Sequence, residues 1–304
     1  MAVLGFVASL LVHRWLVPHF SGDADEAVYV LQAKMLESGR ITLSARDHGL
    51  FFRPWLTGVH DGRIFTQYLP SWPAALALSD SVFGTMVIAP AAMVSVWIVG
   101  TYAMAKELLG ERRTALLAAA LVLFCPLVLL HGSLYLSYVF SAALLTGGAA
   151  LLLHGYRVSS RLELVLAGGA FGLVLLARPF DVFLFGFPVA VYLGGRHWRE
   201  RSKLARAAGS GLLGFGPFVV VLLAYDTRVT GSALRLPIPA SDPLNTFGLR
   251  PAAHAPRPTT RPLHLRDGDG SDAGQRLRTR QLAPGRGPAR RPRAGRLPAT
   301  RAAT

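Results

Sequence analysis

Long apolar segments alternate with short polar segments along most of this chain. A helix that crosses a bilayer needs about 20 predominantly apolar residues, and several of the segments approach that length. We therefore predict an all-α polytopic membrane protein with about seven transmembrane helices. The predicted spans are 2–17, 85–105, 114–131, 133–154, 162–177, 180–195 and 207–226.

Two further helices are predicted between the first and second spans, where a long loop covers 18–72. Segment Asp25–Ser38 carries apolar residues at roughly helical spacing and stops before Gly39, which favours an amphipathic helix that ends there. The stretch 72–84 is interpreted as a half-buried helix that leads into the second span.

Composition supports the membrane class. Hydrophobic residues make up 52% of the chain and charged residues 16%, whereas soluble domains carry about 25% charged residues. The single Cys125 lies in an apolar segment and excludes a disulfide framework. Residues 1–12 lack the basic region and cleavage site of a signal peptide, and a start farther upstream is an open alternative.

Lys and Arg residues in the short connections predict the orientation. Cytoplasmic loops are enriched in these residues, so we expect three alternate connections to face the cytoplasm. The opposite, extracytoplasmic face then receives the loop 18–72 and the turns at 131–133 and 178–181. The basic residues are Lys106, Arg112 and Arg113; Arg157 and Arg161; and Arg196, Arg199, Arg201, Lys203 and Arg206.

Three acids, Asp23, Asp25 and Glu26, begin the predicted amphipathic helix. Acidic residues at a helix N-terminus cap it and complement its dipole. Alternatively, one carboxylate acts as a general base for an acceptor hydroxyl, because partial desolvation near the lipid raises a carboxyl pKa toward the useful range. Both interpretations fit the pattern.

Other candidates lie on the same predicted face. Arg178 suits either a snorkelling arginine or a phosphate clamp. Tyr135 and Ser137, and likewise Tyr68 and Trp72, suit either an interfacial aromatic belt or contacts to a sugar.

Motifs for nucleotides and metals are missing from the sequence. The nine His residues have no metal-ligand spacing, and no phosphate-binding or dinucleotide-binding glycine pattern occurs. We therefore expect no metal, no cofactor and no nucleic-acid partner. An outward-facing membrane enzyme then needs an activated substrate that is delivered on a lipid.

The polar blocks resemble those of the GT-C glycosyltransferases, the clan of protein mannosyltransferase-like and aminoarabinose transferase-like membrane enzymes. The likeness covers roughly residues 1–248. Its blocks are Asp25-Glu26 with Tyr29, Gln32-Ala33 and Gly39-Arg40; Asp61-Gly62-Arg63 through Tyr68–Pro73; Gly132–Ser137; and Ala177-Arg178-Pro179. Leu69-Pro70-Ser71 stands where relatives often have Pro-Pro-Gly, and Tyr138 where they often have His.

The resemblance implies transfer of a sugar from a polyprenyl-phosphate donor to an extracytoplasmic glycan, lipid or protein at the plasma membrane. It implies that Asp25 deprotonates or orients the acceptor, that Glu26 is a supporting acid, and that Arg178 contacts the donor phosphate. The other expected substrate-binding residues are Asp23, Tyr68, Trp72, Tyr135 and Ser137. A different class remains open, a non-catalytic carrier or flippase of a lipid-linked substrate.

The segment 249–304 changes character. From residue 250 onward, thirteen Arg and three Asp supply +10 of the net charge of +15, and Ile, Val, Phe, Tyr, Trp and Met are absent. Such a segment cannot form a core and is expected to be disordered. We interpret it as a frameshift product of a GC-rich gene, which would make the chain a truncated and inactive transferase fragment. The alternative, a basic tail that binds lipid or nucleic acid, fits the predicted outer location of this segment less well.

Overall fold

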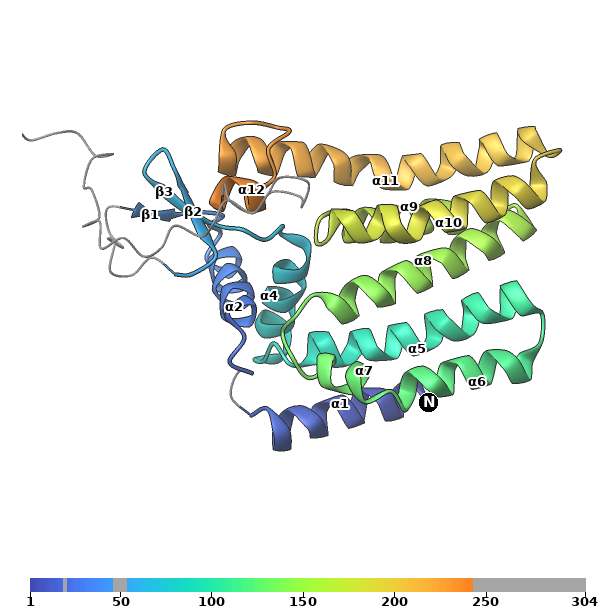
Figure 1. The fold of residues 1–304 in the computed structure, drawn as a ribbon, viewed down its shortest axis with the longest axis horizontal. Coiled ribbons are helices and arrows are strands. Elements are labelled where there is room, and N and C mark those ends of the chain that lie inside the picture. The colour runs from blue at the N-terminus through green and yellow to red at the C-terminus, as the bar shows by residue number, and fades with distance from the viewer. Residues whose placement is uncertain (19–20, 46–53, 243–304) are drawn as a thin grey trace, which may run out of the picture. The chain divides into compact units, whose positions relative to one another are not determined.

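The computed structural model describes residues 1–18, 21–45 and 54–242 (Figure 1). This part of the chain is mostly helical. Three of its helices are long and apolar enough to cross a membrane, which indicates membrane association. They are α5 (Ile88–Leu109), α8 (Tyr138–Val158) and α11 (Arg201–Thr230).

Each of the seven predicted apolar segments contains helix. The amphipathic helix predicted at 25–38 and the helix predicted at 72–84 are confirmed as α2 and α4. The remaining helices are α1 (Ala2–Leu16), α2 (Ala24–Glu37), α4 (Ser71–Phe83), α6 (Arg112–Leu123), α7 (Pro126–His131), α9 (Arg161–Leu175), α10 (Pro179–His197) and α12 (Pro237–Ser241).

Two helix boundaries differ from the prediction. The segment 114–131 is divided into α6 and α7 because Pro126 has no backbone N–H to continue a helix and instead begins the next one. The segment 133–154 becomes helical only at Tyr138. The backbone before that point is held by side chains of other elements, and we name residues 132–137 the α7–α8 turn.

Close helix contacts depend on glycine. α9 packs against α8 and α11, and α5 packs against α1, α6 and α8. A Cβ atom at Gly168 would overlap the carbonyl of Gly211, and one at Gly214 would overlap the carbonyl of Val165. The backbones of α9 and α11 therefore touch, which is how small residues stabilise helix pairs in membranes.

A small antiparallel sheet departs from the all-α expectation. Its strands are β1 (Leu43–Ser44), β2 (Thr57–His60) and β3 (Arg63–Thr66), in the order β1-β3-β2. Asp61 and Gly62 both have positive φ, at 48° and 68°, and they form the two-residue hairpin turn that Asp-Gly favours. Phe65 packs with Tyr225 of α11, so the sheet is anchored to the helices.

The helices of the first compact unit, 1–250, have two distinct ends (Figure 1). The connections α5–α6, α8–α9 and α10–α11 lie together at one end, which we name the basic end. The sheet, α2, α4, the α7–α8 turn and the α9–α10 turn lie at the other, which we name the sheet end. The predicted domain boundary near 248 and the tail 249–304 fall outside the described residues.

Candidate functional site

Glu26 is a buried anchor of the sheet end. Its side chain is among the largest that are fully buried, at 1% exposure. Its carboxylate accepts hydrogen bonds from the backbone N–H of Ser21 (2.8 Å), the hydroxyl of Ser21 (2.6 Å) and the backbone N–H of Tyr135 (2.8 Å). Since a buried carboxylate is stable only when it is bonded in this way, Glu26 joins the start of α2 to the α7–α8 turn.

Asp23 and Asp25 have different surroundings although they are two residues apart. Asp23 is the exposed N-cap of α2, and its Oδ1 accepts a hydrogen bond from the backbone N–H of Asp25 at 2.9 Å. Asp25 is partly buried, and its carboxylate, together with burial, raises the pKa of the Tyr68 phenol. The capping interpretation thus describes Asp23, while Asp25 presents its carboxylate to a phenol.

Two stacked tyrosines connect Asp25 to the α7–α8 turn. The rings of Tyr29 and Tyr68 stack with centroids 4.2 Å apart. The amide of Gln67 donates to the Tyr68 hydroxyl at 2.9 Å, and the hydroxyls of Tyr29 and Ser137 are hydrogen-bonded at 2.9 Å. Burial raises the pKa of Tyr29 to about 12, and burial together with Asp25 raises the pKa of Tyr68 well above its usual range. Both phenols therefore stay protonated at neutral pH.

Arg178 lies at the start of α10, on the same side of the molecule. Its guanidinium lies over the ring of Tyr138 at 4.5 Å from the centroid. Its Nε donates to Asp181 at 2.6 Å, and its side chain is 32% exposed. The charge of Arg178 lowers the pKa of the Tyr29 phenol while that of Asp25 raises it, so an acid and a guanidinium both lie within electrostatic range of one tyrosine.

The side chains of Trp72 and Tyr135 pack against other residues and are not exposed in a binding cleft. Trp72 is fully buried, its indole N–H donates to the Tyr135 carbonyl at 2.7 Å, and its ring meets Phe140. The Tyr135 ring lies beside the His13 ring, with centroids 5.8 Å apart. Trp72 thus positions Tyr135 and does not offer an exposed face for a sugar ring.

Sequence reasoning missed a second shell of polar residues. The amide of Gln32 donates to the Tyr68 carbonyl at 3.0 Å and to the Tyr225 hydroxyl at 3.1 Å, which ties α2 to the far end of α11. The available signal was polar Gln32 three residues after Tyr29 on α2, since residues at that spacing share a helix face. Among the described residues, no group of three or more His, Cys, Asp or Glu is arranged to hold a metal.

The structure thus brings together Asp25, Tyr68, Ser137 and Arg178, and it uses Asp23, Glu26 and Trp72 to cap, anchor and pack the same region. A carboxylate beside a protonated phenol, with a guanidinium nearby, can accept a proton and bind an anionic group. Comparison with known proteins finds no matching family model, no matching curated protein and no matching solved structure. The resemblance to GT-C enzymes therefore stays a prediction.

Proposed function

We propose that this chain is a membrane glycosyltransferase that moves a sugar from a polyprenyl-phosphate donor to an extracytoplasmic acceptor. The observation that carries the proposal is the convergence of Asp25, Tyr68 and Arg178 at the sheet end. These residues come from segments far apart in the sequence, and Tyr29 interacts with all three. A solely structural cap at the start of α2 does not account for the nearby guanidinium.

The reaction is a displacement at the anomeric carbon. Asp25 accepts the proton of the acceptor hydroxyl as its oxygen forms a bond to the anomeric carbon, and the bond from that carbon to the donor phosphate breaks. The leaving group is the polyprenyl phosphate, whose negative charge Arg178 stabilises. Tyr68, held by Gln67, orients the Asp25 carboxylate. Glu26 contributes indirectly, because it holds the α7–α8 turn that carries Ser137.

The proposed membrane placement follows from the two ends. The connections at the basic end carry Lys and Arg and belong in the cytoplasm by the positive-inside tendency. The sheet end then faces outward from the plasma membrane. All seven apolar segments are assigned as spans in this proposal, the shorter ones included. The donor reaches the site within the lipid, and the acceptor, a glycan, lipid or protein, approaches from outside.

A reconstituted assay tests this function. The purified chain in liposomes is given a panel of polyprenyl-phosphate hexoses and pentoses, and release of free polyprenyl phosphate is measured together with sugar transfer to added acceptors. Transfer or release above that of protein-free liposomes supports the proposal. Movement of the donor across the bilayer without release of polyprenyl phosphate contradicts it and favours a carrier.

A further inference from the structure

An apolar groove runs along α8, α9, α10 and α11, away from the sheet-end site. Its volume is about 610 Å³, and its lining is almost entirely apolar. Gly186 and Gly194 of α10 line it as well, and a Cβ atom at either position would meet no other atom within 4 Å. The groove therefore has room for a hydrocarbon chain.

A small basic cavity adjoins this groove at the basic end. Its volume is about 40 Å³, and Arg161, Lys203 and Arg206 line it. Tyr156 and Ala207 line both the cavity and the groove, so the polar and apolar spaces lie on either side of the same two residues. Arg161 is the first residue of α9, and Lys203 and Arg206 lie in the first two turns of α11.

The positive charge of this cavity is mostly uncompensated. Within the described part of the chain, Lys203 has one acidic neighbour, Glu200 at 3.8 Å, while its ammonium also lies 4.6 Å from the centre of the Tyr156 ring. Arg206 donates only to a backbone carbonyl, that of Ser202, and Arg161 makes no ion pair there. Three cations thus surround the cavity against one carboxylate.

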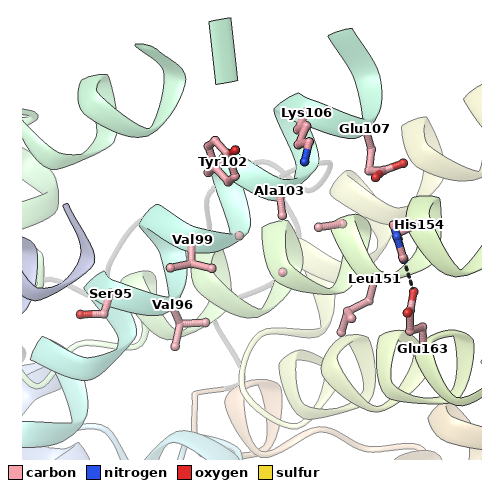
Figure 2. Close-up of a pocket in the computed structure, with 13 residues that line it drawn as sticks. Ser95, Val96, Val99, Tyr102, Ala103, Lys106, Glu107, Leu151, His154 and Glu163 are labelled. Atoms are coloured by element: carbon pink, nitrogen blue, oxygen red, sulfur yellow. Dashed lines mark hydrogen bonds and ion pairs between the residues drawn. The ribbon is translucent and has the colours of Figure 1, made fainter. Parts of the chain in front are cut away.

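A second groove of similar size differs from the first in the charge at its end. The groove between α5 and α8 is of similar size, about 600 Å³, and also ends at charged residues (Figure 2). There His154 is hydrogen-bonded to Glu163 at 2.6 Å, and Glu107 accepts two hydrogen bonds from Arg157. Lys106 is the single lysine or arginine that lines this groove, and among the described residues it makes no ion pair, so the groove lacks a concentrated positive charge.

We propose that the α8–α11 groove and its basic cavity bind one anionic phospholipid from the cytoplasmic leaflet. The phosphate lies among Arg161, Lys203 and Arg206, and an acyl chain lies along the groove. Charge complementarity identifies the phosphate, because guanidinium and ammonium groups at the cytoplasmic end of membrane helices bind anionic headgroups. The position of the basic cavity next to the apolar groove favours a lipid, since a soluble phosphate makes no use of an apolar surface. This inference does not depend on the proposed transferase activity.

Native mass spectrometry of the purified full chain tests the headgroup contact. With equal phosphatidylglycerol and phosphatidylcholine added in detergent, we expect one phosphatidylglycerol to be retained in preference. The triple variant R161Q/K203Q/R206Q should lose that preference by at least about tenfold, because each of the three cations attracts the anionic headgroup. The matched control R112Q/R113Q/R199Q removes equal charge from the same end and should retain the preference for phosphatidylglycerol. Equal retention of the two lipids by wild type, or equal loss in both triple variants, would overturn the proposal.

A second pair of variants tests the groove and remains decisive if the charge variant does not fold. Gly186→Phe fills the α8–α11 groove, whereas Gly147→Phe fills the α5–α8 groove, where a Cβ atom also meets open space. Gly186→Phe should weaken the binding of long-chain phosphatidylglycerol at least about fivefold and leave the binding of an analogue with six-carbon chains unchanged. Gly147→Phe should affect the binding of neither lipid. No effect of Gly186→Phe contradicts the proposal. Displacement of the lipid from wild type by millimolar inorganic phosphate, with no dependence on chain length, reduces the site to a simple anion site and also contradicts it.

Discussion

The sheet end and the basic end use polar residues in opposite ways. At the sheet end, Glu26 and Tyr29 are buried, and each makes a hydrogen bond to a residue more than a hundred positions away, Tyr135 for Glu26 and Ser137 for Tyr29. At the basic end, Lys203 pairs weakly with a residue three positions away. Buried and fully bonded polar groups fix one geometry, while exposed charges adapt to whatever approaches. The first pattern suits a site for chemistry, and the second suits a membrane surface.

The largest expected effect comes from removing the buried anchor. Glu26→Ala leaves the backbone N–H of Tyr135 without its acceptor, which costs about 1–3 kcal/mol for a buried group, and it releases two donors of the exposed Ser21 to water. We expect a loss of about 3 kcal/mol in the free energy of unfolding. Thermal unfolding in detergent measures it. The matched variant at the basic end is Arg157→Gln, whose side chain is 64% exposed and which should cost less than about 1 kcal/mol. Equal losses in the free energy of unfolding for the two variants would contradict the proposed difference between the ends.

The next effect concerns Arg178. Arg178→Gln removes the cation that stabilises the leaving phosphate, and we expect kcat/KM for the donor to fall about 10²-fold, the scale typical of one lost transition-state contact. Arg178→Lys keeps the charge without the forked geometry and should recover part of the loss. Steady-state release of polyprenyl phosphate measures both variants, with Arg199→Gln as the control at the basic end. A loss in Arg199→Gln as large as that in Arg178→Gln would argue against a site at the sheet end.

The smallest effect is a dependence of stability on alkaline pH. The pKa of Tyr29 is near 10 in the unfolded chain and about 12 in the folded protein, chiefly because of burial. Because the pKa is raised in the folded protein, the contribution of the protonated Tyr29 to the free energy of unfolding is complete below pH 10. It is lost as the pH rises toward 12, by up to about 1.4 kcal/mol per pH unit. The unfolding midpoint of wild type should therefore fall more steeply than that of Tyr29→Phe between pH 10 and 11.5. Parallel pH profiles would contradict the burial of this phenol.

The helices could be predicted because their signal is local. Runs of apolar residues fix their existence and approximate length, and Pro126 marks the break between α6 and α7. The sheet was missed because its longer strands have only four residues, although Asp61-Gly62 between two short β-prone stretches is a hairpin signal. The late start of α8 was not predictable, since the bonds from Glu26 and Trp72 that hold the α7–α8 turn join distant parts of the chain.

Residue types at the candidate site could be predicted, but their pairing could not. The sequence indicated Asp25 and Arg178 through their position beside apolar segments. The residue pattern alone did not distinguish Asp25 from Glu26, whose separate roles only the resemblance implied. The two differ because successive helix residues point about 100° apart and only Glu26 points into the buried contact with Tyr135. The effect of Asp25 on Tyr68 depends on how α2 and the residues before α4 pack together, and no periodicity encodes that packing.

The most direct test of the proposed site compares two neighbouring carboxylates. Asp25→Asn removes the proposed base, and Asp23→Asn replaces the N-cap of α2 by a residue that caps equally well. Both proteins are assayed for kcat of sugar transfer in the same liposomes, with thermal unfolding as a check on folding. We expect Asp25→Asn to lose at least about 10²-fold in kcat with unchanged stability and membrane insertion, and Asp23→Asn to stay within about twofold. Wild-type turnover by Asp25→Asn would contradict the assignment of this site.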